Sequence, residues 1–244
     1  MLNRTQFQTT FITEQGQVTV SVAEAGPAFL PVSKKAAAPL IIEGVLIPVE
    51  DQVPGTEGLD LPSERVIVPI PTAQSLAAAG QARDNVFVAL DAQRDEHGKI
   101  TGFGALGRVT HAPAPQTLAA GGEEVRELRV LTPHAITVRL DGDPAGEPDL
   151  TIPSAVTGEE ARGIGRQAEK VVTTSETVEI DGLAVPVREV SYGEVTLPDP
   201  VPGVGFVVSM VAASAARRAD LYVPVTFPGP DERPAGCTGL RRIR

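Results

Sequence analysis

The stretch GFGALGRV, Gly102 to Val109, returns near the end of the chain as GCTGLRRI, Gly236 to Ile243. A glycine, a leucine, an arginine and a branched aliphatic residue recur at the same spacing in both. The glycines resemble a phosphate-binding loop, but no predicted helix follows either stretch to point its positive dipole end at a phosphate. The repetition instead predicts a strand that the chain contains twice, with glycines at a bulge or a close strand crossing.

A second repeated motif lies upstream of each of these strands. IEGVLIPV, Ile42 to Val49, is matched by IDGLAVPV, Ile180 to Val187. In each, an acidic residue and a glycine separate two runs of β-formers, which predicts a β-hairpin with a two-residue turn. A proline near the end of the second arm favours an edge or terminal position, because proline cannot donate to a sheet.

The segments between these motifs are also alike. Residues 65–88 and 204–223 each read as an apolar strand, an alanine-rich helix, an arginine with an acidic residue, and another apolar strand. We place the helices at 72–81, with Gly80 as the stop signal, and at 209–218.

We therefore predict a β-rich α+β fold of two homologous units, each with a short alanine-rich helix on a twisted antiparallel or mixed sheet. The N-terminal repeat unit spans 1–111, a linker spans 112–124, and the C-terminal repeat unit spans 125–244. The sequence leaves open whether the repeats are separate domains or one body with pseudo-twofold symmetry.

Composition narrows the possible partners. The chain of 244 residues has a formal net charge of −10, which disfavours general binding to nucleic acid. Aromatic residues make up 4%, so we expect an aliphatic core. The polar N-terminus lacks the apolar run of a signal peptide, and no stretch approaches a membrane span. We expect cytoplasmic synthesis and no membrane partner.

The second repeat carries LTPHAITV, IPSAVTGEEARG, VVSMVAASAARRADLYVP and GCTGLRR. In these elements the chain resembles a family of small, largely uncharacterised proteins from bacteria, phages and prophages. The resemblance covers roughly 131–243 and, more loosely, 42–109. It departs at 153–163, where the serine–glycine spacing is longer, and the first repeat has no LTPH. The resemblance implies a phage-related origin, with the virion as one location, and leaves the mechanism open.

Few residues are candidates for chemistry. No nucleophile, base and orienting group converge in the sequence, so we expect no enzymatic activity and no catalytic residues. No histidines or cysteines have metal-ligand spacing, so we expect no metal and no cofactor. Cys237 lies near arginines, but its counterpart Phe103 favours a buried packing position. His134 either hydrogen-bonds a local backbone carbonyl or binds a ligand.

Two functional hypotheses follow. The preferred one is a structural or assembly protein, a component of a phage particle or another multimer, whose partners are copies of itself or other assembly proteins. We expect its contacts, on a neighbouring subunit or the other repeat, from the two ends of the chain: Leu2, Phe7, Phe11, Arg241, Arg242 and Arg244. The alternative is a small-ligand-binding protein of phage or prophage origin that sequesters a ligand of host defence through His134, Arg162 and Arg166.

Overall fold

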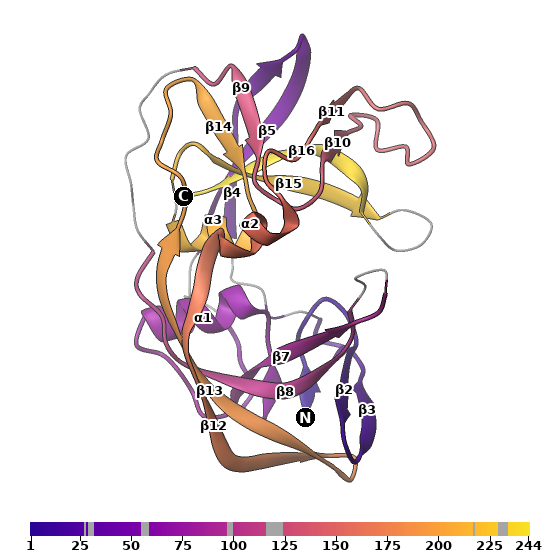
Figure 1. Cartoon of the computed structure of the whole chain (residues 1–244), viewed down its shortest axis with the longest axis vertical. Helices are drawn as coiled ribbons and strands as arrows, with labels where there is room; N and C mark the ends of the chain where they lie inside the picture. Colours follow the sequence, from indigo (N-terminus) through magenta and orange to yellow (C-terminus); the bar gives the residue numbers. More distant parts are fainter. Residues whose placement is uncertain are drawn as a thin grey trace. The chain divides into compact units, whose positions relative to one another are not determined.

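The structure, a computed structural model, describes residues 1–26, 28, 32–54, 59–96, 100–115, 124–216, 218–228 and 234–244, without the side chains of Pro54 and Arg162. The chain divides into two compact units, and each is drawn from three separate segments (Figure 1). Unit 1 comprises Met1–Pro31, Gly55–Ala114 and Ala168–Glu194. Unit 2 comprises Val32–Pro54, Pro115–Gln167 and Val195–Arg244.

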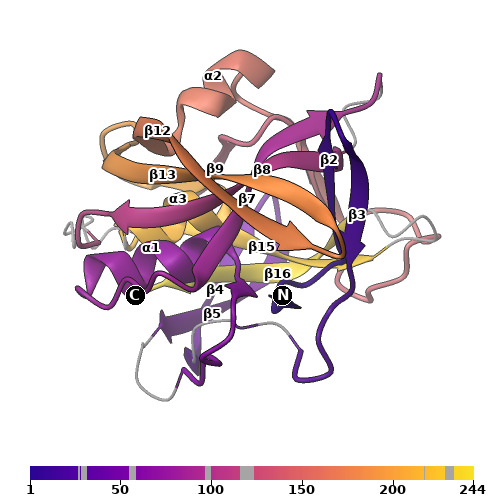
Figure 2. The ribbon, with the colours of Figure 1, turned by 90° about the horizontal axis from the view of Figure 1, so that it is seen from below.

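Unit 1 is built on a mixed sheet of eight strands in the order β1-β6-β7-β8-β13-β12, with β2 paired to β3 and β8. The β2–β3 hairpin is the indigo pair of strands in Figure 2. Its elements are β1 (Leu2–Asn3), β2 (Thr9–Thr13), β3 (Gly16–Val20), β6 (Val66–Ile67), α1 (Ile70–Ala78), β7 (Val86–Arg94), β8 (Ile100–His111), β12 (Gly165–Ile180) and β13 (Leu183–Thr196).

Unit 2 has a second mixed sheet of eight strands, in the order β11-β10-β16-β15-β14-β9, with β5 paired to β16 and β4. Its elements are β4 (Val32–Ile42), β5 (Val45–Pro54), β9 (Glu127–Val130), β10 (Ile136–Val138), β11 (Leu150–Ile152), α2 (Gly158–Gly163), β14 (Val204–Val207), α3 (Met210–Ala216), β15 (Leu221–Pro228) and β16 (Pro234–Ile243). No helix of the described residues is long and apolar enough to cross a membrane.

The two units have the same topology, so the predicted β-rich α+β fold of two homologous units is confirmed. In unit 1, β6 runs parallel to both β1 and β7, and β7 runs antiparallel to β8. In unit 2, β14 runs parallel to both β9 and β15, and β15 runs antiparallel to β16. The small hairpins β2–β3 and β10–β11 also correspond, because β2 pairs in parallel with β8 and β10 pairs in parallel with β16. The duplication therefore reaches further toward the N-terminus than the motifs indicated.

The long hairpin in each unit comes from the half of the sequence that does not supply the rest of that unit's sheet. The β4–β5 hairpin pairs in parallel with β16, whereas β12–β13 pairs in parallel with β8. The registers are equivalent: β5 places Val49 beside Leu240, and β13 places Val187 beside Leu106. The compact units therefore do not coincide with the continuous segments 1–111 and 125–244. Most of the expected linker, at 116–123, lies outside the described residues.

Both hairpin turns have the conformation that their sequences predicted. Glu43 and Gly44 have φ of 49° and 82°, and Asp181 and Gly182 have φ of 46° and 83°. Positive φ at both central positions defines a type I′ turn, whose twist matches that of the flanking strands. Glycine is favoured at the second position because it adopts this conformation without steric cost.

The helices lie close to their predicted positions but are shorter. Helix α1 begins two residues before the predicted start, because Pro71 in its first turn has no amide that needs a partner. It ends at Ala78, where Gly80 (φ 68°) and Gln81 donate backwards to Ala77 and Leu76. This is the glycine-terminated C-cap that the sequence indicated.

The core is aliphatic, and the exchanged hairpins form part of it. In unit 1, Ile180, Val185 and Val187 are buried with Phe11 and Leu106. In unit 2 the equivalent hairpin buries its side chains against Cys237 and Leu240; they are Leu40, Ile42, Ile47 and Val49. Each such aliphatic side chain contributes about 1.5–3 kcal/mol when removed from water. Each unit therefore depends on a hairpin supplied by the other half of the sequence.

Candidate interaction surface

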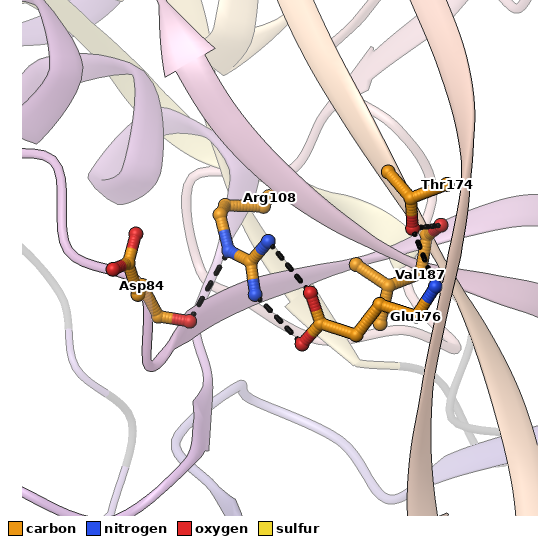
Figure 3. Close-up of polar contacts among 5 residues, drawn as sticks. All are labelled: Asp84, Arg108, Thr174, Glu176 and Val187. Carbon is orange, nitrogen blue, oxygen red and sulfur yellow. Dashed lines mark hydrogen bonds and ion pairs between the residues drawn. The ribbon is translucent and has the colours of Figure 1, made fainter.

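An arginine of β8 fastens the exchanged hairpin to unit 1 (Figure 3). Arg108 Nη1 and Nη2 donate to the two carboxylate oxygens of Glu176 on β12, at 3.0 and 2.9 Å. Its Nε donates to the backbone carbonyl of Asp84 at 3.2 Å. The guanidinium also lies over the ring of Phe87, 5.3 Å from its centroid. This two-bond geometry fixes both position and orientation.

The backbone around Glu176 is held by its neighbour Thr174 (Figure 3). Thr174 Oγ1 donates to the carbonyl of Val187 on β13 at 2.7 Å and accepts from the amide of Glu176 at 3.1 Å. The hydrogen bonds from Arg108 lower the pKa of the Glu176 carboxyl, and those to Glu176 raise the pKa of Arg108. The pair is therefore charged at neutral pH and ties β12 to β8.

The three C-terminal arginines that we considered for partner binding contact the exchanged hairpin of unit 2, on β5, whereas Arg108 of unit 1 binds β12. Arg242 Nε donates to Asp51 Oδ1 at 2.7 Å, and Arg244 lies 3.5 Å from the same oxygen. Arg241 lies 3.6 Å from Glu50. All three are thus engaged with β5, which the N-terminal repeat contributes.

The N-terminal candidates differ in how accessible they are. Leu2 pairs in parallel with Val66 and packs against the core of unit 1. Phe11 is 0% exposed and lies in a core cluster with Val187 of the exchanged hairpin. Phe7 is 64% exposed, so it offers a partner far more surface than the other two.

The predicted ligand-binding residues all lie in unit 2. His134 is exposed, and its backbone carbonyl accepts a hydrogen bond from Thr132 Oγ1 at 3.0 Å. Arg166 is 7% exposed at the start of β12. The side chain of Arg162, in α2, lies outside the described part of the structure.

A small pocket lies beside β10 and the start of β16, near His134 in sequence. Its volume is about 110 Å³, and its lining includes Thr137, Thr226 and Cys237. Sites for small molecules are usually about 300–1,000 Å³. Burial raises the pKa of the Cys237 thiol to about 11, so it stays protonated at neutral pH. Among the described residues, no group of three or more His, Cys, Asp or Glu side chains could hold a metal ion.

The surfaces best suited to an extended partner are the two hairpin edges. β4 pairs with β5 and β12 pairs with β13, and neither has a second partner among the described strands. Both strands are long, and residues 32–36 of β4 and 167–173 of β12 are all exposed. An edge strand presents unpaired backbone N–H and C=O groups, which can pair with another strand.

The two edges differ in their side chains. β4 carries Lys34, Lys35 and Pro39, and its register shifts between Ala37 and Leu40. Lysine, proline and irregular register all discourage pairing. The equivalent part of β12 has Val171 and Val172, which are 48% and 38% exposed, followed by threonines. β12 is therefore the more receptive edge.

Sequence reasoning did not identify this surface. The charged residues of 158–170 are typical of an exposed, partly helical segment, but only 158–163 is helical and β12 begins at Gly165. The β-branched residues from Val171 to Thr174 were the available signal for a strand. Comparison with models of protein families, with curated proteins and with solved structures found no match for this chain.

Proposed function

We propose that this chain is a non-enzymatic structural or assembly protein, a component of a homo-oligomer or of a larger particle such as a phage virion. The observation that carries the proposal is the long, exposed edge of β12. This edge carries exposed valines and threonines, whereas the equivalent β4 edge carries lysines and a proline. A protein that works alone gains from blocking such an edge, whereas an assembly protein gains from leaving it open.

The use of charge in the fold supports the same proposal. Arg108 and Arg242 pair with carboxylates on other strands of their sheets, and Arg218 pairs with Asp220, two residues along the chain. These charged groups stabilise the fold. The resemblance of 131–243 to phage and prophage proteins supports a place in a particle.

The test is the size of the purified protein in solution. Light scattering coupled to size exclusion, from micromolar to millimolar protein, should give an oligomer whose mass rises to a plateau. Electron microscopy of the same fractions should show particles of uniform size. A monomer throughout this range would overturn the proposal. Binding of a small anionic ligand by that monomer, lost on substitution of His134 or Arg166, would favour the sequestering alternative.

A further inference from the structure

We propose that two copies of this chain associate by antiparallel pairing of their β12 edges, along Lys170–Glu176 and centred on Thr173. This inference rests on the proposed assembly function and specifies the surface and the partner, a second copy of the chain. The pairing segment Lys170–Glu176, with the sequence KVVTTSE, lies wholly in unit 1.

The first step is that this edge is open. β12 ends the strand order of its sheet, and no other described strand pairs with its outer side. Val171, Val172 and Thr173 are all exposed, and all three are β-branched. Such residues favour strand geometry and pack well against a neighbouring strand. The segment thus combines free backbone groups with side chains suited to pairing.

The second step is that β4 provides an internal comparison. Counted from the equivalent hairpin turns, Leu40 and Ile42 correspond to Val178 and Ile180, and all four are buried. On the same count, the positions of Lys34, Lys35 and Pro39 are occupied in β12 by Val172, Thr173 and Thr177. One edge of a duplicated fold therefore carries the residues that prevent pairing, and the other carries none of them at those positions.

The third step is that the segment complements itself. In an antiparallel pair centred on Thr173, Lys170 faces Glu176 of the second copy at both ends. Cross-strand pairs of opposite charge stabilise a sheet, and like charges destabilise it. An in-register parallel pair would place Lys170 beside Lys170 and Glu176 beside Glu176. The charges therefore select the antiparallel arrangement, which also gives the closed twofold symmetry usual in homodimers.

Glu176 can take part without losing Arg108. Its side chain is 39% exposed in the pair with Arg108. A carboxylate has about four lone-pair sites, of which the two bonds from Arg108 occupy two. Lys170 of the second copy can then approach the remaining sites from the solvent side.

The test uses Thr173→Lys in the full-length chain. It places two like charges at the centre of the twofold pair and introduces a lysine, the residue that β4 has at the same count from its turn. We expect self-association to weaken about tenfold or more, with an unchanged circular dichroism spectrum. The matched control is Lys35→Thr, the reverse change on β4, which should leave this dimer unaffected. Unchanged association of a folded Thr173→Lys variant would overturn the proposal.

Cysteine cross-linking provides a second test that does not depend on that variant. Thr173→Cys should form a disulfide between copies under mild oxidation, because residues directly opposite have Cα atoms about 4.5–5.5 Å apart. Lys170→Cys should not, because the two copies of residue 170 would lie roughly 20 Å apart. Cross-linking of both variants would indicate parallel pairing, and cross-linking of neither would exclude this interface; both results overturn the proposal. An oligomer that persists in Thr173→Lys would leave the assembly function standing and reject only the β12 interface.

Discussion

At the scale of single residues, each repeat has a side chain after its alanine-rich helix that donates to the carbonyl of an equivalent proline, but the two repeats use different residues for this. After α3, Arg218 binds Asp220 with distances of 2.9 and 2.6 Å and donates to the carbonyl of Pro198 at 2.6 Å. After α1, Asn85 donates to the equivalent carbonyl, that of Pro62, at 2.9 Å. An amide thus replaces an arginine in the first repeat, and Arg83 is left exposed.

Arg218→Ala should therefore be strongly destabilising. The side chains of Arg218 and Asp220 are only 2% and 8% exposed, so the substitution leaves a buried, uncompensated carboxylate. We expect a loss of about 3–5 kcal/mol in the free energy of unfolding, measured by urea titration. Arg83→Ala, at the equivalent exposed position, should change it by less than about 0.5 kcal/mol. Equal effects of the two substitutions would show that the pair has no special role.

The pair between Arg108 and Glu176 should make stability depend on pH in the acid range. The pKa of Glu176 is lowered in the folded state, so the contribution is complete above the unfolded value of about 4.3. It is lost as the pH falls through the lower, folded value. The difference in melting temperature between the wild type and Glu176→Gln should therefore be largest near pH 7 and shrink below about pH 4. A difference that does not vary with pH would contradict this assignment.

At the scale of elements, glycines let strands approach closely at equivalent places. A Cβ on Gly102 would lie 3.2 Å from the carbonyl oxygen of Thr10, and one on Gly236 would lie 3.0 Å from that of Thr137. The two contacts correspond, because β2 and β10 have the same place in their units. The repeated glycines thus mark close strand approaches, as their position in predicted strands indicated.

Gly239→Ala should destabilise unit 2. The new Cβ would lie 2.8 Å from the backbone oxygen of Pro48, which cannot rotate away as a side chain can. We expect a loss of about 1–3 kcal/mol in urea unfolding. Gly158→Ala is the control, because nothing lies within 4 Å of its Cβ position at the start of α2. That control should be neutral or slightly stabilising, and a neutral Gly239→Ala would mean that β5 shifts freely.

The elements also show what the sequence could predict. The hairpin turns are local: an acidic residue and a glycine with positive φ suffice to specify each. The exchange is not local, because a turn does not determine which distant strand its hairpin joins. Likewise, Thr9–Thr13 and Ile136–Val138 share little beyond alternating burial, so their equivalence became visible only through strand pairing. The receptive edge of β12 was missed because the helix signal of 157–163 masked the strand that follows.

At the scale of the whole molecule, the exchange makes each half of the chain incomplete. The fragment 1–115 lacks the hairpin that covers Leu106, and the fragment 124–244 lacks the one that covers Leu240. We expect neither fragment to unfold cooperatively as a monomer, and their mixture to regain the wild-type circular dichroism and melting transition. Cooperative, monomeric folding of 1–115 alone would contradict the structural role of the exchanged hairpin.

The equivalent registers of the two exchanged hairpins also have an evolutionary consequence. We infer that a half-length ancestor once swapped this hairpin with a second copy of itself, and that gene fusion placed both copies on one polypeptide. In such an ancestor both outer strands were necessarily identical. If one could pair with another copy, so could the other, and association could continue into a filament. After fusion the two edges can differ, and in the present chain β4 carries lysines and a proline whereas β12 carries valines and threonines. Association through β12 should then stop at pairs, which electron microscopy at high concentration would show as discrete particles in place of fibres.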